Sequence, residues 1–168
     1  MKKNLFIPDR IFNDIYEITP EYLKNEGLSF VLSDIDNTLV TYGDDEPTEK
    51  LLLWLGSLEA AGIKTAFISN NNKRRVRLFN KRLNYPAYPN SAKPSRKFVF
   101  RLMDEMGAEK GNTCILGDQI FTDVLAAKRA GIRALYVRSI EPPKNLLVKI
   151  KKHFEKRFIT EYYKKNGG

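Results

Sequence analysis

The feature that most restricts the fold is a regular alternation of short apolar runs with segments of helical periodicity. Strands buried on both faces form continuous apolar runs, and their alternation with helices is typical of a parallel sheet covered on both sides. We therefore predict an α/β fold, a three-layer Rossmann-like parallel sheet with right-handed crossovers. The expected strands are 28–33, 63–69, 112–118 and 132–137, with a short edge strand in 85–89, and the expected helices are 47–62, 72–83, 94–107 and 121–131.

Polar residues end three of these apolar runs. Asp34 and Asp36 follow the first run, Ser69 and Asn70 end the second, and Asp118 ends the 112–118 run. The carboxyl ends of parallel strands meet at one edge of the sheet, where ligands bind in such folds. Two positions apart on an extended chain, the first two carboxylates face the same side and repel each other unless a cation lies between them. One polar site is therefore expected at this edge.

The carboxylates can be assembled into a phosphoryl-transfer reaction. A carboxylate is a nucleophile toward phosphorus, and a covalent aspartyl-phosphate divides hydrolysis into two easier steps. Asp34 and Asp118, with a backbone carbonyl and water, suit octahedral Mg²⁺. Asp36 could then protonate the leaving oxygen and later activate water.

Three further groups suit the transferring oxygens. Ser69, the backbone amide of Asn70 and the ammonium of Lys93 could hold these oxygens where charge spreads in the transition state. Because Pro94 is expected to begin a helix, Lys93 would also lie at a helix N-terminus, which favours a phosphate.

Composition limits the alternatives. The 168 residues suit a single domain, and no apolar run approaches the ~20 residues of a spanning helix. The first residues lack the pattern of a signal peptide, so a cytoplasmic location is expected. The single cysteine, Cys114, excludes an internal disulfide, and one Cys with one His makes a zinc site of the usual kind untenable. Residues 1–27 are expected to pack on the sheet as an extension.

At this point the chain resembles the haloacid-dehalogenase-like (HAD) superfamily of phosphohydrolases. The segments "DIDNT", "FISNN", "AKPSR" and "LGDQIFTD" resemble its four motifs and occur in the family's order. The resemblance implies that Asp34 is the nucleophile and a magnesium ligand, that Asp36 is the acid/base with its carbonyl on the metal, and that Asp118 is a metal ligand. It also implies phosphoryl binding by Ser69 and Lys93.

The same resemblance places two residues behind the metal ligands. Asp123 would be an acid that supports the metal ligands from behind, and Thr38 of the first motif would have a similar supporting position. An alternative for Asp123 is that it complements the dipole of the 121–131 helix. The second aspartate, Asp36, is absent from dehalogenases and P-type ATPases of the superfamily, so its presence favours phosphatase or mutase chemistry.

The spacing of the motifs leaves no room for a cap domain. An uncapped site would be open and would suit a phosphate carried by a macromolecule or a membrane. The helix expected in 72–83 begins at the rim of the site, with Arg74, Arg77 and Lys81 on its polar face. These residues are either a solvated surface or a dock for a second phosphate of the substrate, with Arg74 and Arg77 as the substrate-binding candidates.

Positive charge is concentrated in the tail. The chain has 29 Lys and Arg against 20 Asp and Glu, and residues 144–168 hold eight of the basic residues and two of the acids. Apolar residues recur there at steps of three and four: Leu147, Ile150, Phe154, Phe158 and Tyr162. Such a basic amphipathic helix either lies on an anionic membrane, as a peripheral contact, or packs on the sheet through its apolar stripe.

The whole chain also resembles a narrower group, the bacterial YqeG family of subclass IIIA phosphatases, which is related to the mitochondrial phosphatidylglycerophosphate phosphatases. The resemblance implies hydrolysis of phosphatidylglycerophosphate to phosphatidylglycerol in phospholipid biosynthesis, with Mg²⁺ as cofactor. A nucleic-acid end or nucleotide phosphatase is the alternative, although the sequence has no dedicated nucleic-acid motif. A non-catalytic binding module is the third reading, which the paired Asp34 and Asp36 oppose. The sequence specifies no oligomeric state.

Overall fold

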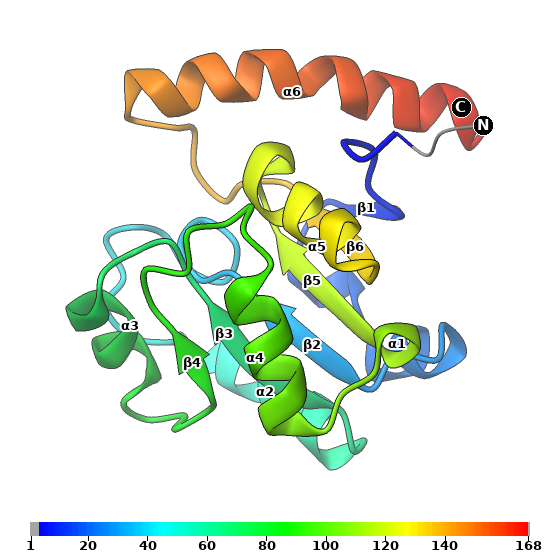
Figure 1. Ribbon diagram of the computed structural model, residues 1–168. Helices are drawn as coiled ribbons and strands as arrows, with labels where there is room; N and C mark the ends of the chain where they lie inside the picture. The colour runs from blue at the N-terminus through cyan, green and yellow to red at the C-terminus, as the bar shows by residue number, and fades with distance from the viewer. Residues whose placement is uncertain (1–3, 168) are drawn as a thin grey trace.

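The computed structural model describes residues 4–167, which form an α/β fold around one parallel sheet (Figure 1). The six strands lie in the order β1-β6-β5-β2-β3-β4, so the first motif strand is near the middle of the sheet. The predicted three-layer parallel architecture is confirmed. The strands are β1 (Arg10–Phe12), β2 (Phe30–Ser33), β3 (Lys64–Ile68), β4 (Ala87–Tyr88), β5 (Thr113–Gly117) and β6 (Arg133–Val137).

The central strands end level with one another because of their register. Ser33 at the end of β2 pairs with Phe67 of β3 on one side and with Leu116 of β5 on the other. All four residues of β2 are buried, as expected for a strand covered on both faces. The residues that follow β2, β3 and β5 therefore emerge together at the carboxyl edge.

Helices cover both faces of the sheet. One core contains Leu51, Trp54, Leu58 and Phe79 under α1 (Pro20–Asn25), α2 (Glu49–Ala60) and α3 (Lys73–Asn80). The opposite core contains side chains of α4 (Lys97–Met106), α5 (Leu125–Ala130) and α6 (Leu146–Lys165). Short helical turns add η1 (Ile15–Glu17), η2 (Lys110–Asn112) and the π-helical turn η3 (Ile120–Val124). Among residues 4–167 no inserted cap domain separates these elements.

Two helices begin later than their prolines suggested. Thr48 caps α2 by accepting a hydrogen bond from the backbone of Leu51, so this helix begins two residues after Pro47. The helix expected from Pro94 begins at Lys97, because the preceding residues form a turn in which Ser95 N donates to Ala92 O. The expectation that Lys93 lies at a helix N-terminus is therefore wrong, and the helix dipole does not act there.

The N-terminal segment extends the sheet. β1 pairs in parallel with β6, and Asp9 reinforces this edge by accepting a hydrogen bond from the backbone of Ala134 at 2.8 Å. Lys128 pairs with the same carboxylate at 2.5 Å. This strand was not predicted, since its three residues are too few to show a periodic pattern.

Helix α6 crosses the carboxyl edge of the sheet, above the ends of the central strands (Figure 1). Its second half packs on the domain, with Phe158 and Tyr162 buried, whereas Leu147 is 69% exposed and Phe154 is 56% exposed. The packing alternative is therefore confirmed for the second half of the helix, whereas contact of the exposed first half with a membrane stays a prediction. None of the helices formed by residues 4–167 has the length and apolar character needed to cross a bilayer.

Candidate active site

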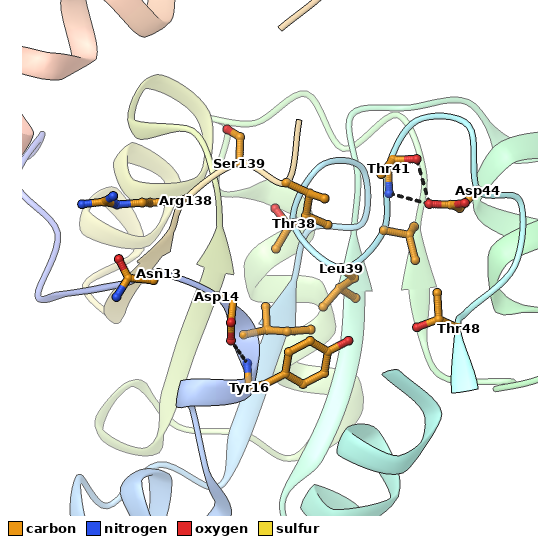
Figure 2. Close-up of a pocket in the computed structure, with 13 residues that line it drawn as sticks. Asn13, Asp14, Tyr16, Thr38, Leu39, Thr41, Asp44, Thr48, Arg138 and Ser139 are labelled. Atoms are coloured by element: carbon orange, nitrogen blue, oxygen red, sulfur yellow. Dashed lines mark hydrogen bonds between the residues drawn. The ribbon is translucent and has the colours of Figure 1, made fainter. Parts of the chain in front are cut away.

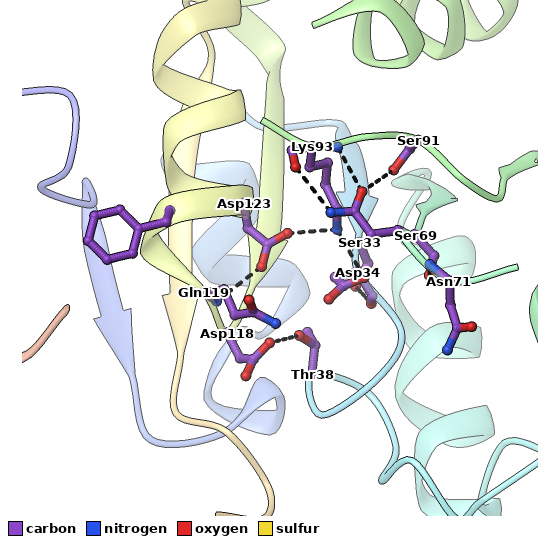
Figure 3. A network of polar contacts seen from close by, with 12 residues as sticks. Ser33, Asp34, Thr38, Ser69, Asn71, Ser91, Lys93, Asp118, Gln119 and Asp123 are labelled. Atoms are coloured by element: carbon purple, nitrogen blue, oxygen red, sulfur yellow. Dashed lines mark hydrogen bonds and ion pairs between the residues drawn. The ribbon is translucent and has the colours of Figure 1, made fainter. Parts of the chain in front are cut away.

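Three buried carboxylates meet at the carboxyl edge of the sheet. Asp34 follows β2, Asp118 follows β5, and Asp123 lies in η3. Each offers one ligand oxygen, and these oxygens lie within 4.8 Å of one another. Figure 3 shows the three side chains facing the same small volume. Residues up to 89 positions apart in sequence thus form one acidic cluster, because β2 and β5 end side by side and η3 follows β5 directly.

A buried lysine holds two of these acids. Lys93 Nζ lies 2.9 Å from Asp34 Oδ1 and 2.6 Å from Asp123 Oδ1 (Figure 3). Burial disfavours the ammonium, but the two carboxylates outweigh this effect and raise the pKa of Lys93. A permanently charged lysine is therefore fixed beside the predicted nucleophile.

Burial controls the charge of the predicted nucleophile. It raises the pKa of Asp34 from 3.8 to about 7, because desolvation and the neighbouring acids outweigh the attraction of Lys93. A divalent cation among the three carboxylates would favour the ionised form. Buried oxygens at this spacing are a donor set that suits a hard cation such as Mg²⁺, so the residues fit the expected metal. Asp34 and Asp118 both lie in this cluster, and their role as metal ligands stays a prediction.

Asp123 reaches the cluster because of the glycine before it. A Cβ built at Gly117 would overlap the side chain of Asp123, so only glycine leaves space for that carboxylate. The other oxygen of Asp123 accepts a hydrogen bond from Gln119 N at 3.0 Å. Although Asp123 lies just before α5, its carboxylate contacts Lys93 and the Gln119 backbone. A residue that only complemented the helix dipole would need neither of these contacts.

Asp36 has a separate position and a partner that the sequence reading missed. Its carboxylate oxygens accept from Arg75 Nε at 2.8 Å and from Asn71 Nδ2 at 2.9 Å. Arg75 is buried on α3, whereas its neighbours Arg74 and Arg77 are exposed. Arg75 is four residues before Phe79, and this spacing places both on the inward face of the helix. The spacing was the sequence signal that could have identified Arg75 as buried. A substrate-binding role for Arg74 and Arg77 stays a prediction.

The residues after β3 arrange the lysine loop. The Asn70 side-chain oxygen accepts from Lys93 N at 2.7 Å and from Ser91 Oγ at 3.0 Å, and its amide donates to Lys93 O. Ser69 is buried, and its hydroxyl accepts from Asn71 N at 3.0 Å. The structure thus places Ser69, Asn70 and Lys93 together, with the Asn70 side chain supporting the loop that carries the lysine.

Helix α6 enters the site through two residues that the sequence reading assigned to a surface tail. Lys152 Nζ lies 3.2 Å from Asp118 Oδ2 and also contacts the Asp118 carbonyl. Burial disfavours this ammonium, but Asp118 outweighs the effect and raises the pKa of Lys152. Glu155 is buried and accepts from Ile120 N at 2.7 Å. The C-terminal helix therefore braces the loop that carries Asp118.

Hydroxyl groups hold the same aspartate from the other side. Thr38 donates to Asp118 Oδ1 at 3.3 Å, so its hydroxyl lies behind the acidic cluster. Ser139, after β6, donates to Asp118 Oδ2 at 2.5 Å. The orientation of Asp118 is thus fixed by side chains from three elements of the fold.

Two hollows flank the turn after β2. One of about 240 Å³ is lined by Asp34, Asp36 and Ser69 and is the place where a substrate phosphate would lie. The other, of about 380 Å³, lies on the far side of Thr38 and Leu39 (Figure 2). In that second hollow, Asp14 accepts from the Tyr16 backbone and Asp44 accepts from Thr41, so these acids are already engaged. The catalytic groups therefore face the first hollow.

Comparisons with known proteins agree with this geometry. The chain is 33% identical over 165 residues to the probable phosphatase YqeG of Bacillus subtilis, covering 98% of this chain and 96% of that protein. A family model described as HAD-hydrolase-like matches residues 90–152, which include Lys93, Asp118 and Asp123.

Solved structures share the fold. The cobalt-bound deoxy-D-mannose-octulosonate 8-phosphate phosphatase of Haemophilus influenzae has a TM-score of 0.56 at 17% identity, covering 83% of this chain and 91% of that chain. The corresponding phosphatase of Moraxella catarrhalis, with magnesium and phosphate bound, has a TM-score of 0.54 at 17% identity and covers 84% and 92%. A subfamily IIIA hydrolase of Legionella pneumophila has a TM-score of 0.52 at 17% identity, covering 89% and 96%. With near full-length similarity to a curated relative, the chain belongs to the HAD-like phosphatases, in the YqeG family.

Proposed function

We propose that this phosphatase is a magnesium-dependent phosphomonoester hydrolase that acts through an aspartyl-phosphate on Asp34, and that its substrate is phosphatidylglycerophosphate. The observation that carries the chemistry is the buried Asp34 carboxylate, held 2.9 Å from the Lys93 ammonium at the floor of a phosphate-sized hollow. Burial prevents bulk water from competing for this carboxylate, and the lysine neutralises the charge that develops on the transferring oxygens.

In the first step Asp34 attacks phosphorus and the bond to the leaving oxygen breaks. Asp36 supplies the proton to that oxygen, and the released alcohol departs. In the second step Asp36 takes a proton from water, the resulting hydroxide attacks phosphorus, and the bond to Asp34 breaks to release phosphate. Ser69, Lys93 and the Asn70 amide bind the phosphoryl oxygens.

The metal would be held by Asp34, Asp118 and the carbonyl of Asp36, with Asp123 beside them. Mg²⁺ supplies charge neutralisation and orientation of the phosphate when it is bound. The relative from Moraxella catarrhalis, whose structure contains magnesium and phosphate, supports this cofactor by analogy of fold. Arg75 holds Asp36 apart from the cluster, so the two acids of the first motif can have different tasks.

The lipid substrate is supported by the surface beside the site. Helix α6 exposes Leu146, Leu147, Ile150 and Phe154, which lie on one side of the helix and form an apolar stripe above the carboxyl edge. Exposed lysines flank this stripe, and each basic residue near an anionic membrane is worth about 1 kcal/mol. An apolar stripe with flanking lysines suits shallow, reversible contact with an anionic bilayer, which would bring a lipid-borne phosphate to an uncapped site.

The set of lysines available to lipid is smaller than the sequence implied. Lys152 is bound to Asp118, so its charge belongs to the site, whereas Lys149, Lys151 and Lys156 are exposed. Reversal of these three to Glu tests membrane contact without disturbing the metal ligand. We expect cosedimentation with phosphatidylglycerol vesicles in the wild type and its loss in the triple variant and at high salt.

The test of the function is turnover of phosphatidylglycerophosphate in vesicles against a 5′-phosphorylated oligonucleotide, with and without Mg²⁺. We expect magnesium-dependent release of phosphate from the lipid and none in the Asp34→Asn variant. Full activity of that variant would refute the assigned nucleophile. A preference for the oligonucleotide would replace the lipid substrate with a nucleic-acid end.

A further inference from the structure

We propose that a further hollow, at the start of α6 and next to the catalytic one, is the leaving-group subsite. It would receive a glycerol phosphodiester that carries acyl chains. This α6 hollow has a volume of about 210 Å³ and is lined among others by Tyr42, Gln119, Lys144, Asn145 and Val148. The inference rests on the phosphatase function proposed above and adds the place where the remainder of a lipid substrate lies.

The α6 hollow adjoins the catalytic hollow. Tyr42 and Gln119 line both, and Asp118 forms part of the α6 hollow while Asp34 and Asp36 line the other. Since the two hollows share these walls, a group bonded to a phosphorus atom at Asp34 would reach the α6 hollow beside Tyr42, whose side chain is exposed. The phenol hydroxyl of Tyr42 is protonated at neutral pH and can donate to an anionic oxygen.

The walls of the α6 hollow are held by specific contacts. The side chain of Asn37 accepts from Glu141 N and donates to Glu141 O, both at 2.8 Å, which fixes the segment that leads into α6. Lys152 and Glu155 then tie α6 itself to the aspartate loop, and Glu155 accepts from Ile120 N. The hollow is thus a built feature of the fold, with walls anchored on two sides.

The lining has the order of chemistry that a phospholipid presents. Beyond the catalytic residues lies Lys144, whose exposed pair with Glu141 at 3.4 Å is weak enough to exchange for an anion. Val148 and Pro143 give the hollow apolar surface, and Leu147, next to Val148 in sequence, belongs to the exposed apolar stripe of α6. The phosphate monoester would lie at Asp34 and the phosphodiester at Lys144. The acyl chains would then lie on the apolar stripe.

This position differs from the one that the sequence suggested for a second phosphate. The residues that line the two hollows in the described chain do not include Arg74 or Arg77 of α3. The two locations can therefore be distinguished by mutation, since one depends on the α6 hollow and the other on α3.

The experiment compares two substrates with the same reacting glycerol monoester. One is a short-chain phosphatidylglycerophosphate, used below its micelle concentration so that membrane contact plays no part, and the other is glycerol 3-phosphate. We expect Lys144→Glu and Val148→Asp each to lower kcat/KM for the lipid by about tenfold more than for glycerol 3-phosphate. In the first variant one charged hydrogen bond is lost, and in the second a carboxylate faces the anionic, apolar lipid. Lys144→Arg should retain the wild-type ratio. Lys110→Glu, an exposed charge reversal at the amino end of β5, is the matched control, and urea unfolding verifies that each variant is folded.

The outcomes separate the inference from the function on which it rests. A ratio within about twofold of wild type in both Lys144→Glu and Val148→Asp would overturn the subsite. So would a selective loss in Arg74→Glu with Arg77→Glu, which would place the diester on α3. If the wild-type enzyme hydrolyses glycerol 3-phosphate and ignores the soluble lipid, the lipid function itself fails, and the subsite fails with it.

Discussion

Replacing the nucleophile should abolish activity and remove a pH-dependent loss of stability from the metal-free protein. In Asp34→Asn a neutral amide takes the place of a buried carboxylate that lies among two other acids. Burial raises the pKa of Asp34 from 3.8 to about 7. Each pKa unit is worth about 1.4 kcal/mol, so the ionised form of this group costs the folded state about 4 kcal/mol well above pH 7.

The sign of the pH dependence follows from where the proton resides. Below about pH 4 Asp34 is protonated in both the folded and the unfolded chain, and it contributes no pH-dependent term. As the pH rises toward 7 the unfolded chain releases this proton while the folded chain retains it, so the free energy of unfolding of the wild type falls. The variant lacks this loss, and its advantage over the wild type should grow by about 3 kcal/mol between pH 5 and pH 8.5. Lys93 stays charged throughout this range, so its lost partner adds only a constant offset.

Urea unfolding with EDTA present measures this difference, with the fluorescence of Trp54, which is the chain's one tryptophan and is buried, as the signal. The exposed Asp104→Asn variant is the control and should follow the wild-type curve. Added Mg²⁺ should recover stability at high pH in the wild type more than in Asp34→Asn. Parallel stability curves for the wild type and Asp34→Asn would refute the reasoning, because they would mean that the Asp34 carboxylate is not destabilised by burial.

Three other variants test the remaining parts of the site. Asp36→Asn should accept phosphate from an aryl phosphate and then hydrolyse it slowly, so rapid-quench mass spectrometry should detect a phosphorylated enzyme. Gly117→Ala should force Asp123 away from Lys93, lowering kcat by more than tenfold and the free energy of unfolding by about 1–3 kcal/mol, measured by initial rates and urea unfolding. Lys152→Met should bind Mn²⁺ more tightly in calorimetry, because Thr38 and Ser139 still hold Asp118 while a competing charge is gone. Weaker binding would instead make Lys152 an organiser of the metal ligand.

The sequence predicts those parts of the fold in which burial requires several consecutive residues to be apolar. Strands β2, β3, β5 and β6 are continuous apolar runs because both of their faces are covered, and the polar residues at their ends mark the site. β1 escaped prediction because its three residues depend on a pairing with β6 more than 120 positions away. The start of α4 was misplaced because a proline is compatible with a turn as well as with the first position of a helix.

The supporting residues of the site were hidden for a different reason. Arg75 and Lys152 lie in basic segments whose composition is typical of solvated surfaces, and the basic residues next to them, Arg74 and Lys151, are exposed. Each contacts an acid that is distant in sequence: Arg75 contacts Asp36, 39 positions away, and Lys152 contacts Asp118, 34 positions away. No local sequence pattern predicts such a contact. Glu155 was equally inconspicuous, as one of only two acids in a basic tail.

The distribution of these cations explains how four buried aspartates coexist. Lys93, from the loop after β4, serves Asp34 and Asp123, while Arg75 from α3 serves Asp36, and Lys152 from α6 serves Asp118. Each cation comes from a different element, so the acids are stabilised only when all three elements are docked on the sheet. Removing one partner of a buried pair costs about 3–5 kcal/mol. The assembled site is therefore a consequence of the complete fold. Because α6 supplies one of the three cations while exposing an apolar stripe on its outer side, the surface proposed to meet lipid and the aspartate proposed to bind metal are connected by a single helix.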